Sequence, residues 1–231
     1  MGRPLRLQQA GYAYHVLNRG NGRVRLFETS ADYASFERIL ESACQRTRMR
    51  LCAYCVMPNH WHLVVWPRED GDLARFVGWL SLTHTQRWHA FRHSAGSGHV
   101  YQGRYKSFVI QRDAHFLHVC RYVERNALRA GLVDRAEAWR FSSLWRRHSG
   151  DAESRRCLSG WPVARPDHWL RLANSNQPAA QVEQIQMSIQ RERPLGDDTW
   201  IKRTARRLGL ETTLRPRGRP KNQKLTTKKA S

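Results

Sequence analysis

Residues 56–65 read Val56-Met57-Pro58-Asn59-His60-Trp61-His62-Leu63-Val64-Val65. Two apolar runs flank the turn-forming pair Pro58-Asn59, so we predict a tight hairpin that joins a strand over residues 51–57 to a strand over residues 60–66. Residues two apart on a strand share a face, so the imidazoles of His60 and His62 should lie side by side, with Trp61 opposite. Paired imidazoles can bind a metal ion. Two solvent-facing strand residues are the alternative, because a His-x-His also arises by chance in a chain with 11 histidines.

Around this hairpin the pattern predicts alternating strands and helices. We expect a strand over residues 12–17, a turn over residues 18–22 and a helix capped by Ser30. Asp72 should open a second helix, residues 101–111 should form a fourth strand, and Asp113 should cap a third helix through about residue 130. This order is the split βαβ pattern. We therefore predict an α+β fold: a ferredoxin-like antiparallel sheet with helices packed on one face, and with its first and third strands central.

The third predicted helix carries a tyrosine and an amide. Tyr122 and Asn126 are four residues apart, so they share one helical face. An unassisted phenol is a poor nucleophile at neutral pH, and a nearby metal ion or base would assist it. We interpret Tyr122 as a candidate nucleophile, with a residue that packs on the sheet as the alternative. His118, one turn earlier, is interpreted as a polar surface residue rather than as a base or a phosphate contact.

The formal net charge of +21 is a second strong signal. A surplus that large implies a polyanionic partner, most simply nucleic acid. An anionic membrane surface is the alternative, but no lysine-rich amphipathic helix stands out. The candidate DNA contacts are Asn18, Arg19, Arg104 and Lys106. A metal ion, a tyrosine nucleophile and a very basic chain together suggest the cutting and joining of DNA.

The five cysteines are scattered, which argues against a disulfide framework. Cys52 and Cys55 form a lone C-x-x-C, which we interpret as strand core rather than as a zinc or redox site, because no second pair follows at zinc-finger spacing. No apolar run is long enough to span a membrane, and the N-terminus lacks the apolar stretch of a signal peptide. We expect a cytoplasmic protein associated with the nucleoid.

The character of the chain changes near residue 148. We predict a nuclease domain over residues 1–148, a packing and helical extension over residues 149–214, and a basic, disordered tail over residues 215–231. The tail contains the Pro-Arg-Gly-Arg-Pro core that AT-hooks use, in which Arg217 and Arg219 fit a narrow A·T minor groove. Two alternatives are a tail that raises affinity without reading sequence, and a tail that folds back over the active site.

Five segments of the chain carry a resemblance to a known family. They are Tyr14-His15-Val16-Leu17-Asn18-Arg19-Gly20-Asn21, Met57-Pro58-Asn59-His60-Trp61-His62, Tyr101-Gln102-Gly103-Arg104-Tyr105-Lys106, residues 122–133 and residues 208–220. In this order and at this spacing the chain resembles the single-tyrosine HUH transposases, and more narrowly the REP-associated tyrosine transposases. The resemblance covers nearly the whole chain, and several separate motifs at compatible spacing make it far more specific than His-x-His alone.

The resemblance implies a metal-dependent single-stranded DNA endonuclease and transposase. His60 and His62 would hold Mg²⁺ or Mn²⁺, with Asn126 as a supporting ligand, and the ion would polarise the scissile phosphate. Tyr122 would attack the phosphorus and form a 5′-phosphotyrosine link that stores the bond energy for rejoining. The implied substrate is a single strand with a hairpin from a repetitive extragenic palindrome and a short guide sequence beside it. A monomer is expected more than a homodimer.

Two rival interpretations stay open. A catalytically silent DNA-binding protein would recognise the same hairpins without the metal-dependent cleavage that Tyr122→Phe removes. A relaxase or replication initiator would use the same metal-and-tyrosine chemistry, but usually in a longer chain or with a helicase. A metalloprotease is disfavoured because the chain has no His-Glu-x-x-His.

Overall fold

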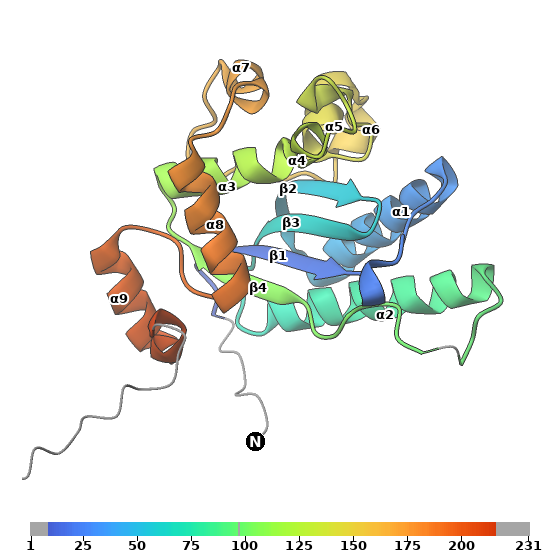
Figure 1. The fold of residues 1–231 in the computed structure, drawn as a ribbon, viewed down its shortest axis with the longest axis horizontal. Helices are drawn as coiled ribbons and strands as arrows, with labels where there is room; N and C mark the ends of the chain where they lie inside the picture. The colour runs from blue at the N-terminus through green and yellow to red at the C-terminus, as the bar shows by residue number, and fades with distance from the viewer. Residues whose placement is uncertain (1–8, 97, 216–231) are drawn as a thin grey trace, which may run out of the picture.

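A four-stranded antiparallel sheet forms the centre of the computed structural model, which describes residues 9–96 and 98–215 (Figure 1). The strands are β1 (Ala13–Arg19), β2 (Arg50–Met57), β3 (His60–Trp66) and β4 (Lys106–Ile110), in the order β2-β3-β1-β4. All three strand pairs are antiparallel, and β1 and β3 are the central strands. The predicted α+β, split βαβ architecture is confirmed.

One face of the sheet is covered by α1 (Ser30–Thr47) and α2 (Asp72–Phe91), whose apolar stripes are buried in a first core. The cap of α1 is Thr29 rather than the predicted Ser30. The Thr29 hydroxyl accepts a hydrogen bond from the backbone N–H of Asp32, and the Asp32 carboxylate accepts one from the backbone N–H of Thr29. A capping box joins residues three apart, so the position of Asp32 selects Thr29 as the cap.

The opposite face is covered by helices that follow β4. They are α3 (Ala114–Glu124), α4 (Asn126–Arg129), α5 (Ser143–Ser149), α7 (Trp169–Asn174) and α8 (Ala179–Arg191), and they enclose a second core. In Figure 1, α3 and α4 lie above the sheet, whereas α2 lies below it. The predicted placement on one face therefore holds for the two helices of the βαβ units. The strands are apolar on both faces, so the later helices must cover the second one.

The ends of two predicted strands differ from those observed. Asn18 and Arg19 belong to β1, because their positions pair with Trp61 and His60 of β3, and the predicted turn starts only after them. The strand predicted over residues 101–111 is shorter in the structure, where β4 begins at Lys106. Gly103 lies just before it with φ of 141°, in a region that favours glycine, and the backbone there is not extended.

The helix predicted through residue 130 is divided at Arg125, which has φ of −93° and ψ of 11°. The backbone N–H of Arg125 still donates to the carbonyl of Arg121 at 3.0 Å, so the chain continues to turn in the helical sense. Tyr122 at the end of α3 and Asn126 at the start of α4 therefore stay one turn apart.

Residues after 148 form α6 (Ala152–Arg155), then α7, α8 and α9 (Asp198–Arg207), so the helices predicted near residues 181–192 and 199–208 are present. Three short 3₁₀ helices complete the described elements: Asn21–Arg23, Ala136–Ala138 and Glu211–Leu214. The extension packs into the second core, where the buried indole N–H of Trp169 donates to the carboxylate of Glu124 at 2.6 Å.

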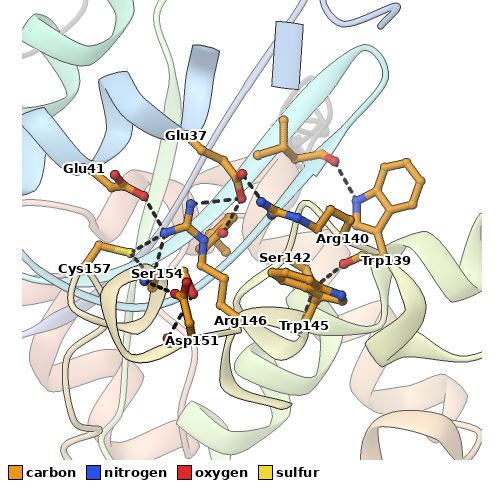
Figure 2. Close-up of polar contacts among 12 residues, drawn as sticks. Glu37, Glu41, Trp139, Arg140, Ser142, Trp145, Arg146, Asp151, Ser154 and Cys157 are labelled. Atoms are coloured by element: carbon orange, nitrogen blue, oxygen red, sulfur yellow. Dashed lines mark hydrogen bonds and ion pairs between the residues drawn. The ribbon is translucent and has the colours of Figure 1, made fainter. Parts of the chain in front are cut away.

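Arg146 of α5 joins α1 to the start of the extension (Figure 2). Its guanidinium donates to the carboxylate of Glu41, lies 3.4 Å from the carboxylate of Glu37, and donates to the backbone carbonyl of Ser154. The side chains of Arg146 and Glu37 are 6% and 3% exposed. These charges are therefore paired inside the protein, where an unpaired charge would be costly.

Candidate functional site

The polar groups that the sequence singled out gather around one cavity of about 660 Å³ at one end of the sheet. Its lining includes His60, His62, Tyr122, Asn126, Asn18, Arg19, Arg104 and Lys106. These residues come from three strands, the loop before β4 and the α3–α4 segment. Gln186 and Gln190 of α8 form another part of the wall. Arg217 and Arg219, the two predicted contacts in the tail, lie outside the described residues.

The alternation of β3 places the histidine pair in this cavity. Trp61 points to the first core, where it is fully buried and its indole N–H donates to the hydroxyl of Tyr101 at 3.0 Å. His60 and His62 therefore face the opposite side, toward α3 and α4. Their ring centroids are 4.9 Å apart and their planes are nearly perpendicular. This geometry agrees with the strand pattern. It excludes the alternative interpretation of the pair as two solvent-facing strand residues, because His62 is only 4% exposed.

Both imidazoles are held neutral. Burial lowers the pKa of His60 to about 4, with help from the nearby Arg19 and Arg129 guanidinium groups. Burial also lowers the pKa of His62 well below its usual value, and the neighbouring His60 and His15 act in the same direction. At neutral pH each ring therefore offers a nitrogen lone pair, which is the form that binds metal ions.

A third histidine, His15 of β1, lies against the pair, and the sequence reasoning missed it. Its Nε2 is 2.9 Å from Nδ1 of His62, and the two rings stack with centroids 5.0 Å apart. His15 is fully buried, and burial lowers its pKa to about 3. The available signal was strand alternation, because His15 is in phase with Leu17 and Arg19 on a strand predicted to be central and adjacent to the histidine strand.

Tyr122 completes the group from the last turn of α3. Its ring centroid is 6.0 Å from that of His62 and 6.5 Å from that of His15, and the residue is 5% exposed. The guanidinium carbon of Arg129 lies 4.1 Å from the centre of the Tyr122 ring, a cation–π contact that orients the phenol. Arg129 was also missed, although it follows Tyr122 by seven residues, about two helical turns.

Asn126 is buried near these groups, and its amide oxygen is hydrogen-bonded to Arg129. The amide oxygen accepts a hydrogen bond from an Arg129 Nη at 3.2 Å, while Nδ2 is buried without a hydrogen-bond partner among the described residues. In this orientation Asn126 offers a donor rather than a metal ligand. A role as a supporting ligand requires the amide to turn its oxygen toward the histidines.

The donor set fits a divalent ion that still needs oxygen ligands. In the described part of the chain, no three or more His, Cys, Asp or Glu residues come together as a metal site. Asn59 Oδ1 accepts a hydrogen bond from Nδ1 of His60 at 2.6 Å, which leaves the lone pair of that neutral ring on Nε2. Two imidazoles leave most positions of a six-coordinate ion to water, an amide or phosphate oxygens, which are ligands that Mn²⁺ and Mg²⁺ accept.

The rim of the cavity is cationic. Its lining holds four cations, Arg19, Arg104, Lys106 and Arg129, against the single carboxylate of Glu192. The loop before β4 is fixed to the end of β1, because the backbone N–H of Gln102 donates to the carbonyl of Arg19 at 2.9 Å. The resulting field suits the phosphates of a nucleic acid strand.

Other candidates from the sequence lie elsewhere. Two other tyrosines, Tyr54 and Tyr101, belong to the first core, where the hydroxyl of Tyr54 donates to Glu37 and that of Tyr101 is bonded to Trp61 and His84. The ring of His118 lies 3.2 Å from the amide of Gln181 on α8, which makes it a half-buried packing residue rather than the predicted surface residue. The C-x-x-C pair, residues 52 and 55, is buried strand core with free thiols, as predicted.

Comparison with known proteins decides the family. A family model described as "Transposase IS200 like" matches residues 8–126, just over half of the chain. The chain belongs to the IS200-like transposase family. A REP-associated tyrosine transposase of Escherichia coli (strain K12) is 22% identical over 138 residues, which cover 60% of this chain and 79% of that protein. The predicted resemblance to the REP-associated branch is thereby confirmed.

The fold of this IS200-like transposase is also found in a solved structure. A solved structure of a REP-associated tyrosine transposase bound to a REP hairpin matches with a TM-score of 0.53 and 19% identity, over 78% of this chain and 96% of that one. Membership in a transposase family implies an enzyme that cleaves DNA. Within the described residues, no helix is both long enough and apolar enough to cross a membrane.

Proposed function

We propose that this transposase cleaves and rejoins single-stranded, hairpin-bearing DNA through a 5′-phosphotyrosine at Tyr122. The observation that carries the proposal is that Tyr122, His60 and His62 line one cavity whose rim carries four cations. The hairpin in the matched solved structure supports the substrate class. Cytoplasmic, nucleoid-associated location and a monomeric state remain predictions.

The reaction divides the work among the cavity residues. The hydroxyl oxygen of Tyr122 attacks the phosphorus and loses its proton, while the bond from phosphorus to the 3′-oxygen breaks and that oxygen leaves as a 3′-hydroxyl. Rejoining is the reverse attack by a 3′-hydroxyl on the phosphotyrosine. Arg129 holds the phenol through its cation–π contact, and its charge beside that phenol would stabilise the negative charge on the phosphate.

His60 and His62 would hold the divalent ion through Nε2, and the ion would supply Lewis-acid stabilisation of the charge that develops on the phosphate. Asn126 would serve as a supporting oxygen ligand once its amide has turned. Asn18, Arg19, Arg104 and Lys106 would position the strand by contacts to phosphates or bases.

The test is covalent capture. Labelled single-stranded hairpin DNA is incubated with the protein and Mn²⁺ and run on a denaturing gel. We expect a protein–DNA adduct that is absent in Tyr122→Phe, in His60→Ala and after chelation of the metal. Tyr105→Phe, which removes a tyrosine outside the cavity, should retain it. Tight binding without an adduct, across several metals and hairpins, would refute the nuclease and establish the silent DNA-binding protein.

A further inference from the structure

His15 contacts a proposed metal ligand without lining the cavity itself. It is fully buried on β1, on the sheet face toward Tyr122 of α3, with its Nε2 2.9 Å from Nδ1 of His62. The ring of Phe108 lies on another side, with centroids 4.9 Å apart. Nδ1 of His15 is buried and has no hydrogen-bond partner among the described residues. The polar contact that His15 makes is therefore directed at His62.

The direction of this hydrogen bond decides what His62 can do. A neutral imidazole has one N–H and one lone pair. If Nδ1 of His62 carries the proton and donates to Nε2 of His15, the lone pair of His62 is at Nε2, where a metal ion can bind. If His15 donates instead, Nε2 of His62 carries the proton and has no lone pair to give. Metal binding through Nε2 therefore requires His15 to be the acceptor.

We propose that His15 is a positioning residue for metal binding: its Nε2 accepts the Nδ1–H of His62, which fixes the ring and leaves Nε2 of His62 for the ion. This inference rests on the proposed function, because it assumes the metal site. Asn59 has the matching relation to His60, whose Nδ1 lies 2.6 Å from the Asn59 amide oxygen. The two ligands are thus supported from different elements, one by the turn before β3 and one by the neighbouring strand β1.

Outer partners of metal-bound histidines set the tautomer and ring orientation, and losing one weakens metal binding about 10- to 100-fold. Two amide substitutions separate this role from packing. The Gln side chain in His15→Gln places its amide at the level of Nε2 and can still accept from His62. The shorter Asn side chain in His15→Asn places the same amide at the level of Nδ1, where it cannot accept the hydrogen bond from His62. Both remove the imidazole, so both carry a similar packing cost.

The first measurement is the Kd for Mn²⁺ of the full chain without DNA, by titration calorimetry, with melting temperatures recorded for every variant. We expect the Kd of His15→Gln to stay within about 3-fold of the wild-type value and that of His15→Asn to rise about 10- to 100-fold. Equal Kd values for His15→Asn and the wild type would overturn the inference while leaving the metal site intact. A wild-type chain that binds no Mn²⁺, or a His60→Ala variant that binds it normally, would overturn the proposed metal site and this inference with it.

A second measurement needs no substitution. Long-range ¹H–¹⁵N NMR spectra of the wild-type protein with Zn²⁺, a diamagnetic probe, report which ring nitrogen of His62 carries the proton. We expect the proton at Nδ1. A proton at Nε2 would overturn the inference, even if both variants failed to fold.

Discussion

Acid should destabilise this protein well above the pH at which carboxylates titrate, because the fold holds four histidines neutral, three of them buried and His60 partly buried. Burial lowers the pKa of His15 to about 3 and those of His60 and His84 to about 4, and it lowers the pKa of His62 well below its usual value. In the unfolded chain each imidazole titrates near its ordinary pKa of about 6.5. Between pH 6.5 and about 4, the unfolded chain therefore binds protons at these histidines that the folded protein does not bind.

The sign and size of the effect follow from this difference. The stability contributed by these groups is fully present above pH 6.5 and falls as the pH falls toward 4. Near pH 5.5, each histidine contributes a slope of about 1.2 kcal/mol per pH unit, so four contribute about 5. Burial raises the pKa of Glu124, which has the opposite sign and offsets at most one histidine. The free energy of unfolding of a typical domain is about 5–15 kcal/mol, so most of it should be lost near pH 5.

The assay is urea unfolding at pH 7.5, 6.5 and 5.5, followed by tryptophan fluorescence. His84→Gln removes one of the four groups far from the cavity, in the first core, and should reduce the slope by about a quarter. A slope below about 1 kcal/mol per pH unit between pH 6.5 and 5.5 would show that the folded protein takes up these protons, and would refute the reasoning.

Three further perturbations test other parts of the structure. Arg146→Met should lower the free energy of unfolding by about 3 kcal/mol, because among the described residues buried Glu37 then keeps the half-exposed Arg140 as its one cationic partner, beside the neutral hydroxyl of Tyr54; adding Glu37→Gln should recover part of the loss in urea titrations, and no recovery would contradict the charge argument. Arg129→Gln should slow adduct formation about 100-fold in single-turnover gels, with the surface variant Arg38→Gln unaffected; equal rates would exclude Arg129 from the reaction. The logarithm of hairpin affinity should fall against log salt with a slope of about −3, as expected for four cations on single-strand phosphates, and a slope near zero would remove the rim from the interface.

The sequence predicted the fold well because its strongest signals are local. Each of these signals depends on residues that are close together in the sequence. They are the strand alternation in residues 60–66, the tight turn at Pro58-Asn59 and the apolar stripes of α1 and α2. The errors arose where the structure of a segment depends on pairing or packing with segments that are distant in the sequence. Arg19 extends β1 only because β3 pairs with it, and the second face of the sheet needs covering only once its strands are apolar on both sides.

The grouping of the candidate site residues around one cavity could be predicted in outline because strand and helix periodicity put them in phase, while the residues that contact them were missed. His15 lies 47 residues before His62, and no spacing rule connects them until β1 and β3 are paired in a known register. Arg129 sits beyond the break at Arg125, so its contact with Tyr122 depends on the turn of the chain there. Contacts of this kind join segments that are distant in the sequence, so they produce no periodic pattern from which they could be predicted.

The register of β3 connects the core to the site. The side-chain period of a strand is two, so a slip of one residue would exchange the faces of Trp61 and the two histidines. Trp61 resists that slip, because its fully buried ring lies 5.9 Å from that of Phe36 and its N–H is bonded to Tyr101. Exposing or misplacing this indole would cost several kcal/mol. The first core thereby fixes where the imidazoles point on the opposite face, so the proposed metal site would gain its rigidity from packing on the other side of the sheet.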